Sequence, residues 1–533
     1  MSASLSKIID LINSKSYLKA ELEIDRLIAQ SPNDFNLNKM LGVCLMSRLK
    51  FYKAIDAFQK CISVNKNDYD VLVNLSFSYL KTQDYKNSLY FSNQAILVNE
   101  SRPESYNNLA ENYFFLNDLD KAEENILLSS ERRGGFQSKE ILFFIDTIVL
   151  YADILLAKKK HTKFLEFANT FLDKGYHIDE LLIRVFRLDP SFIKQTHLDN
   201  LKKILKNLNK IKNLVQKNIS EANIFFFLAE YLEKENKSQS EKYYIKANQI
   251  IASVQRESIY KRQNKFKSII KIFSSIDANS ISEKIDPRKG DGLIFIIGMP
   301  RSGTTLMESI IATADNCQAG GEKLFFNLKC NSILSQFPDF DFDFDFFEKL
   351  GNDYLEIIEI QRAKKKFFID KLPENYAYFK FIQLSLPGAK FVHVFRNPWD
   401  NAISLFKQNY AINLFYASSF FGIATEYANY ENLISFWKEN DKNKNIFLDI
   451  DYKDLVNNTE QIANKIWEYC GLTGKYNEND RKNHISVTAS QQQVTKNIYK
   501  SSLEKPDFID FKEQFYVDLE SQRAYWKNLK KLN

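Results

Sequence analysis

Small and apolar residues recur every 34 positions near the start of the chain. One column holds small residues, a second holds leucines that are each followed by a small residue, and a third holds larger side chains. The members are Ala20, Ala54, Ser88 and Ala122; Leu41–Gly42, Leu75–Ser76 and Leu109–Ala110; and Leu45, Tyr79 and Tyr113. Small residues let two helices approach where they cross, and large residues fill the space between them. The pattern therefore predicts pairs of antiparallel helices.

This period resembles the tetratricopeptide repeat, a 34-residue helix pair. An irregular helical bundle with chance spacing is the alternative, which the alignment of three columns disfavours. After residue 135 the register loosens while helical patterns continue, so we predict a solenoid over 1–275 and a linker over 276–291. Because such arrays present a concave surface to another chain, the resemblance implies that the repeats bind a peptide or protein.

The remaining half alternates short apolar runs with helical stretches. The run at 292–298 ends in a glycine and precedes a Gly-rich loop and a helical stretch at 304–314, and further strands are predicted at 366–370, 389–395 and 445–452. Strands that alternate with helices indicate an α/β domain over 292–533, with a mainly parallel sheet and a ligand at the carboxyl ends of its strands.

The loop at 298–305 reads GMPRSGTT. Gly298 and Gly303 have the spacing of a phosphate-binding P-loop, but Thr304 stands where the lysine should follow. In nucleotide triphosphatases that lysine reaches the β- and γ-phosphates. The backbone N–H groups and Arg301 still suit an anion. The loop therefore favours one phosphate group that carries a less charged transferable unit.

The segment PRSGTT resembles the 5′-phosphosulfate loop of sulfotransferases that use 3′-phosphoadenosine 5′-phosphosulfate (PAPS). The segment FRNPWDNAISLF (395–406) resembles the 3′-phosphate motif of these enzymes, and YKDLV (452–456) and SQQQVTK (490–496) resemble their later segments. The resemblance covers roughly 292–510. It is closest to the tyrosylprotein sulfotransferase-like group, which includes bacterial chains that join tetratricopeptide repeats to this domain.

The resemblance implies a role for each matching residue. Glu322 matches the general base, and Lys371 matches the cation that touches the bridging oxygen of the leaving nucleotide. Ser490 is assigned a similar stabilising role, and Arg301 contacts phosphate or orients Glu322. The implied PAPS-binding residues are Arg301, Ser302, Gly303, Thr304, Thr305, Arg396, Ser404, Tyr452, Lys496 and Lys505. The alternatives are a surface glutamate after a glycine turn and a surface lysine at a strand end.

Two positions depart from the pattern of the family. Asn397 stands where aspartate is usual, and Gln408 stands where the tyrosylprotein enzymes have another phosphate-binding arginine. Either binding of the 3′-phosphate is weakened, or the neighbouring Lys407 compensates.

The implied reaction passes a sulfonate group from PAPS to an acceptor hydroxyl and releases the nucleotide product PAP. The resemblance implies protein tyrosine as the acceptor, but a glycan or small-molecule hydroxyl stays open because fold and donor site do not fix the acceptor. A P-loop kinase, which the missing lysine disfavours, and a scaffold with an inactive transferase half are the other hypotheses.

Composition adds few constraints. A net charge of +6 over 533 residues indicates no nucleic-acid function by itself. Five scattered cysteines without a CxxC pair favour reduced thiols in a cytoplasmic protein, and five histidines lack metal-ligand spacing, so no metal is expected. No signal peptide is evident, and the most apolar run, 141–157, carries Asp146 and Asp153, so no membrane span is predicted. Nothing indicates an oligomeric state.

Phenylalanine and aspartate alternate in the segment 337–347. An extended conformation would place the rings on one side and the carboxylates on the other. A Ca²⁺ or basic-peptide site and a locally packed strip or loop are the alternatives, and we assign the segment no function.

Overall fold

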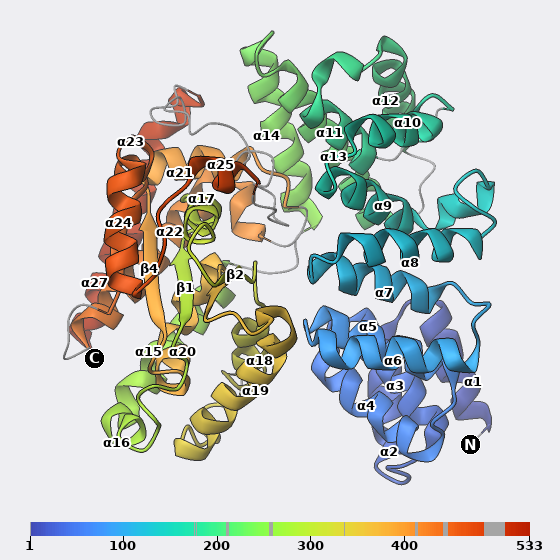
Figure 1. Cartoon of the computed structure of the whole chain (residues 1–533), viewed down its shortest axis with the longest axis horizontal. Helices are drawn as coiled ribbons and strands as arrows, with labels where there is room; N and C mark the ends of the chain where they lie inside the picture. Colours follow the sequence, from blue (N-terminus) through green and yellow to red (C-terminus); the bar gives the residue numbers. More distant parts are fainter. Residues whose placement is uncertain are drawn as a thin grey trace. The chain divides into compact units, whose positions relative to one another are not determined.

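The computed structural model describes residues 2–174, 176, 179–208, 213–254, 259–334, 336–410, 414–440, 446–483 and 507–532. The chain divides into two compact units, residues 1–168 with 357–361 and residues 169–356 with 362–533. The first is built from helices, and the second combines helices with a sheet (Figure 1). The predicted limits of solenoid, linker and transferase domain stay a prediction, and the second unit includes helices that precede residue 292.

Successive helix pairs open the first unit, as the 34-residue period predicts. They are α1 (Ser2–Asn13) with α2 (Tyr17–Ile28), α3 (Phe35–Ser47) with α4 (Phe51–Val64), α5 (Tyr69–Lys81) with α6 (Tyr85–Val98), and α7 (Glu104–Phe115) with α8 (Leu119–Glu131). The four small residues of the first column are all fully buried. In the third pair the two small positions are serines, and Ser76 Oγ lies 3.3 Å from Ser88 Oγ, so the close approach there is also hydrogen-bonded.

The turn inside each pair contains a non-glycine residue with positive φ. These residues are Lys15, Leu49, Gln83 and Asn117, with φ between 58° and 62°. The residue after each donates its N–H to the carbonyl five positions back, as Asp84 does to Tyr79 (2.9 Å). This 6→1 hydrogen bond is that of the Schellman motif, which satisfies carbonyls at the end of a helix. The third sequence column, Leu45, Tyr79 and Tyr113, supplies the accepting carbonyls in three of these turns, and Leu11 supplies that of the first.

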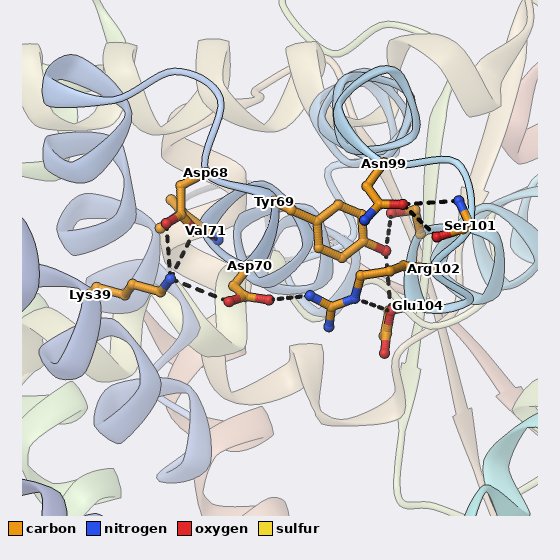
Figure 2. Close-up of polar contacts among 10 residues, drawn as sticks. Lys39, Asp68, Tyr69, Asp70, Val71, Asn99, Ser101, Arg102 and Glu104 are labelled. Atoms are coloured by element: carbon orange, nitrogen blue, oxygen red, sulfur yellow. Dashed lines mark hydrogen bonds and ion pairs between the residues drawn. The ribbon is translucent and has the colours of Figure 1, made fainter.

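Polar contacts also link one helix pair to the next (Figure 2). Lys39 Nζ lies 2.9 Å from Asp68 Oδ1 and 3.4 Å from Asp70 Oδ2, and Arg102 Nη1 lies 2.8 Å from Asp70 Oδ1. The Arg102 guanidinium also lies over the Tyr69 ring, 4.3 Å from its centroid. Exposed ion pairs of this kind contribute at most about 1 kcal/mol each. The buried small-residue columns therefore determine the stacking more strongly than this ladder does.

Further helices lead to the sheet. They are α9 (Ile145–Ala157), α10 (His161–Leu172), α11 (Asp179–Leu188), α12 (Gln195–Asn207), α13 (Leu214–Leu232), α14 (Lys237–Val254), α15 (Ile259–Ser275) and α16 (Ala278–Ser282). Helix α9 contains most of the apolar run at 141–157, and Ile148, Ile154 and Leu155 are fully buried in it. Over the described residues, no helix combines the length and apolar character that a membrane crossing requires.

Within the described residues, five strands form one parallel sheet in the order β2-β3-β1-β4-β5. They are β1 (Leu293–Gly298), β2 (Cys317–Ala319), β3 (Phe367–Asp370), β4 (Lys390–Phe395) and β5 (Leu448–Asp451). The four predicted strands are confirmed to within three residues at each end. The three-residue β2 escaped prediction because it is too short to form an apolar run. A helical N-terminal region followed by a parallel-sheet domain is the predicted fold class, which is confirmed.

Helices cover both faces of this sheet (Figure 1). On one face, Ile294 and Ile296 of β1 pack with residues of α17 (Thr304–Ile311) and α24 (Thr459–Cys470). On the other face, the ring of Phe295 contacts Phe391 and Tyr354, the latter from α19 (Phe344–Arg362). Alternate residues of the central strand are thus buried on opposite faces, which explains its unbroken apolar sequence.

The Phe/Asp segment is a packed turn that leads into α19. Asp343 caps this helix by accepting a hydrogen bond from the Phe346 N–H (2.9 Å). The rings of Phe340, Phe342 and Phe346 form a cluster with centroids 4.9 to 5.5 Å apart. The segment is therefore locally packed, and we assign it no function.

His393 of β4 is a buried titratable residue in the sheet. Its Nδ1 lies 2.6 Å from Asp449 Oδ1, and its Nε2 bonds the Tyr430 hydroxyl. Burial lowers the pKa of His393 below its ordinary value of 6.5, and Asp449 offsets this effect only in part. The neutral ring therefore stabilises the fold fully above pH 6.5, and this contribution is lost as the pH falls through the lowered pKa.

We expect the His393→Asn variant to be less acid-sensitive than the wild type, because asparagine does not titrate. Urea unfolding at about pH 7 and about pH 5 measures the free energy of unfolding of both proteins. The wild type should lose more of it on acidification, by at most about 1.4 kcal/mol per pH unit. An equal loss in the two proteins would contradict this assignment of the acid sensitivity to His393.

Candidate active site

The predicted site residues follow the carboxyl ends of the strands. The loop at 298–305 follows β1, Lys371 follows β3, Arg396 follows β4 and Tyr452 follows β5. The chain that leaves β1 runs to β2 at one edge of the sheet, and the chain that leaves the neighbouring β4 runs to β5 at the other edge. Ligands of open α/β sheets bind at such a switch point.

The glycines of the loop occupy positions where a side chain does not fit. Gly303 has a φ of 106°, and a Cβ there would lie 2.4 Å from Tyr452 Cδ2. A Cβ on Gly298 would lie 2.2 Å from the Val394 carbonyl oxygen. The hydroxyl of Ser302 donates to the same Val394 carbonyl (2.9 Å), which ties the loop to β4. The loop thus packs closely against Tyr452 and the end of β4, and the Ser302 hydroxyl is engaged inside the protein.

Two predicted anion-binding segments meet at Arg301. Its Nε donates to Ser404 Oγ at 3.2 Å, and its carbonyl accepts from Arg396 Nη1 at 3.3 Å. The Arg396 guanidinium lies over the ring of Tyr452, 4.6 Å from its centroid. The structure therefore brings together Arg301 of the predicted 5′-phosphosulfate loop with Arg396 and Ser404 of the predicted 3′-phosphate motif. Tyr452, from the third predicted segment, lies beside them.

Helix α21 (Pro398–Phe406) carries Ser404 into this position. Asn397 caps it, with Oδ1 accepting from the N–H groups of Trp399 and Asp400, and Pro398 occupies its first turn. The sequence reading missed Asn401, a fully buried residue whose Nδ2 donates to the Pro300 carbonyl (3.0 Å). This hydrogen bond ties α21 to the loop.

Glu322 and Lys371 are in direct contact. Lys371 Nζ lies 2.5 Å from Glu322 Oε1, and its side chain is fully buried, whereas that of Glu322 is 43% exposed. The Lys371 N–H donates to the Gly321 carbonyl at 2.8 Å, and the Gly321 N–H donates to Glu308 Oε1 at 3.1 Å. Lys371 is therefore not a surface lysine at a strand end, and the candidate base is within its reach.

A second pair of charged residues lies next to these two in the sequence. Asp370 and Lys323 are almost fully buried, and Asp370 accepts a hydrogen bond from the Tyr354 hydroxyl at 2.9 Å. Burial raises the pKa of Asp370 and lowers the pKa of Lys323, and each charge partly offsets the effect on the other. In the sequence, Asp370 is a carboxylate at the end of an apolar strand, and this position could have indicated a buried charged residue.

Tyr410 is a further residue that sequence reasoning missed. Burial raises the pKa of its hydroxyl, Arg301 acts in the opposite sense, and Glu322 raises it further. Its buried hydroxyl oxygen has no hydrogen-bond partner in the described part of the chain. Tyr410 interacts electrostatically with both Arg301 and Glu322, so its phenol lies in the surroundings of the candidate site.

Family models match two parts of the chain. Residues 294–477 match the sulfotransferase family, and residues 103–132 match a tetratricopeptide repeat. The chain carries a sulfotransferase-family domain and a tetratricopeptide repeat. The matched residues include all of β1 except Leu293, the loop at 298–305 and the segment around Arg396. Neither match distinguishes the tyrosylprotein-like group from other sulfotransferases.

Individual relatives are more distant. An uncharacterized protein of Aquifex aeolicus (strain VF5) is 26% identical over 352 residues, which are 61% of this chain and 45% of the relative. The chain thus spans less than half the length of that relative. Similar solved structures include the sulfotransferase domain of the Synechococcus PCC 7002 olefin synthase (15% identity, TM-score 0.30, covering 46% of this chain and 97% of that chain). A tetratricopeptide repeat protein from Parabacteroides merdae ATCC 43184 has 14% identity and a TM-score of 0.33, covering 47% and 92%.

Some predicted residues of the sulfotransferase domain have no described position. Ser490, Lys496 and Lys505 lie outside the described residues, so their roles stay predictions. Lys407 Nζ lies 2.7 Å from both Glu233 Oε1 and Asp507 Oδ2. Because two carboxylates already neutralise this ammonium, the arrangement does not favour Lys407 as a substitute for the arginine that the tyrosylprotein enzymes have where this chain has Gln408.

Among the described residues, no group of three or more His, Cys, Asp or Glu side chains is placed to hold a metal ion. That sulfonate transfer here needs no metal stays a prediction.

Proposed function

We propose that this protein transfers a sulfonate group from PAPS to the hydroxyl of a tyrosine in a peptide or protein. The contact between Lys371 and Glu322 carries the proposal, because it joins a cation and a carboxylate where strand β3 ends. The sulfotransferase-family match supports the transfer of sulfonate, and PAPS is the donor that sulfotransferases generally use.

The residues at the ends of β1 and β4 fit the two ends of this donor. The backbone N–H groups of the loop, Arg301 and the first turn of α17, with Thr304 and Thr305, supply donors for the 5′-phosphosulfate. Arg396 and Ser404 bind the 3′-phosphate, since the guanidinium fork can bond two phosphate oxygens. The face of the Tyr452 ring contacts the Arg396 guanidinium and holds it in position.

In the proposed transfer, one sulfur–oxygen bond breaks and another forms. The acceptor oxygen attacks sulfur, the bond to the bridging oxygen of PAPS breaks, and the acceptor proton moves to Glu322. A phenol with a pKa of about 10 lies about 4 kcal/mol from its phenolate at pH 7. A carboxylate of ordinary basicity does not deprotonate it beforehand, so proton removal accompanies the transfer. Lys371 stabilises the charge that grows on the bridging oxygen.

The repeats give the proposed acceptor a docking surface. Tetratricopeptide repeats suggest protein interaction, which suits a peptide or protein as acceptor or partner. The five cysteines are free thiols, which agrees with an enzyme that works in the cytoplasm. A glycan or small-molecule hydroxyl is the alternative acceptor.

The melting temperature of the protein with different nucleotides tests the donor site. We expect PAP at about 100 times its Kd to stabilise the protein by about 2.7 kcal/mol, with or without a metal chelator, and ATP with Mg²⁺ to have little effect. Stabilisation by ATP with Mg²⁺ alone would favour the kinase hypothesis.

The acceptor is then identified by incubating host lysate with isotopically labelled PAPS and locating the label by mass spectrometry. Label on glycans or small molecules would overturn the assignment of tyrosine.

A further inference from the structure

A buried arginine from outside the matched domain contacts the segment that follows Lys371. Arg262 belongs to α15, which precedes the sulfotransferase-family match at 294–477. Its Nη2 lies 2.5 Å from Glu374 Oε1 and 2.6 Å from Glu426 Oε1. The exposed fractions are 12% for Arg262, 17% for Glu374 and 0% for Glu426. One guanidinium thus forms ion pairs with two largely buried carboxylates.

The two carboxylates connect α15 to separate elements of the catalytic unit. Glu374 lies in the 3₁₀ helix η4 (Pro373–Tyr378), and Glu426 lies in α22 (Phe420–Glu439). Tyr376 of η4 also donates its hydroxyl to Glu426 Oε1, at 2.7 Å. Arg262 therefore joins three elements at one point.

The backbone between Lys371 and Glu374 has little conformational freedom. Glu374 is three residues after Lys371, and Pro373 between them has a fixed φ. The Asn375 N–H donates to the Leu372 carbonyl at 3.0 Å, and the Lys371 N–H donates to the Gly321 carbonyl at 2.8 Å. A displacement of Glu374 is therefore transmitted to Lys371 and to its contact with Glu322.

Electrostatics make the arginine necessary to this arrangement. Burial alone would raise the pKa of Glu374, but Arg262 and Lys265 hold it below its ordinary value. Without Arg262 only the charge of Lys265 still compensates the two buried carboxylates, so we expect one of them to move toward solvent or take up a proton. Glu426 is the more enclosed of the two, so we expect Glu374 to move.

We infer that Arg262 is a positioning residue of the sulfotransferase reaction, which holds the turn after β3 so that Lys371 meets Glu322 and the donor. The inference rests on the proposed function. It means that α15, although it precedes the family-matched residues, is part of the working enzyme.

The test compares Arg262→Met and Arg262→Lys in the full chain. Arg187→Met is the matched control, because Arg187 also forms a two-pronged ion pair, with Glu230 between α11 and α13. Transfer from labelled PAPS to a tyrosine-containing peptide is measured per PAP-binding site, which removes any misfolded fraction from the comparison. We expect Arg262→Met to lose about 10- to 100-fold in kcat with PAP affinity nearly unchanged, and Arg262→Lys to recover part of it.

Two outcomes separate positioning from a merely structural role. A lower melting temperature with unchanged kcat per PAP-binding site would overturn the inference. If Arg262→Met fails to fold, the double variant Arg262→Met/Glu426→Gln removes one buried charge of each sign. We expect the double variant to bind PAP but to keep a low kcat. A kcat equal to that of the wild type would also overturn the inference. Absence of transfer by the wild type itself would overturn the proposed function, and the inference with it.

Discussion

Lys371→Ala is expected to lower kcat by about 10²- to 10³-fold while leaving the affinity for PAP within about twofold. The ammonium of Lys371 acts on charge that grows only as the bridging oxygen leaves, so its removal raises the barrier and leaves the bound ground state alone. Glu322 remains 43% exposed, so losing its partner does not strand a carboxylate in the interior. The measurements are steady-state transfer from labelled PAPS and titration calorimetry with PAP.

A matched control for this variant is Lys364→Ala, an exposed lysine on the segment just before β3. Lys364→Ala should keep wild-type turnover. Lys371→Arg should keep part of it, because arginine retains the positive charge on a side chain of different length and shape. Equal kcat in Lys371→Ala and the wild type would remove Lys371 from the mechanism. A parallel loss of PAP affinity would instead assign it to nucleotide binding.

Arg396→Met is expected to weaken PAP binding by about 10- to 100-fold, the value of a charge-assisted hydrogen bond to phosphate. The same substitution should weaken the binding of adenosine 5′-phosphate far less, because this nucleotide lacks the 3′-phosphate. Arg396 is buried beneath Tyr452 and bonded to the Arg301 carbonyl, so its guanidinium is already oriented. The effect should therefore be on nucleotide affinity and not on the rate of the bound complex.

Calorimetry with the two nucleotides measures this discrimination directly. Arg288→Met, which removes an arginine that is 82% exposed, controls for net charge and should leave both affinities unchanged. An equal loss for PAP and adenosine 5′-phosphate in Arg396→Met would place Arg396 on the 5′ side. No loss for either nucleotide would exclude it from the donor site.

Local sequence was sufficient for the elements that surround the candidate donor site. The apolar run of β1, the glycines at 298 and 303, and the cap at Asn397 are each determined within a few residues, by burial, steric fit and side-chain hydrogen bonding. The repeat columns predicted the helix pairs for the same reason. The positive φ in each turn could not be predicted, because Lys15, Leu49, Gln83 and Asn117 share no chemistry, and the Schellman hydrogen bonds hold their conformation.

The sequence by itself thus determined the two kinds of architecture, the P-loop-like turn and the charged residues that follow the strands. Only the tertiary structure decided which of those charges meet. Glu322 and Lys371 are 49 positions apart, Arg301 and Ser404 are 103 apart, and Arg262 and Glu374 are 112 apart. Their contacts depend on the strand order and on where α15 packs. Local propensity carries no information on either, because a buried ion pair forms only where the folded chain excludes water and brings both partners together.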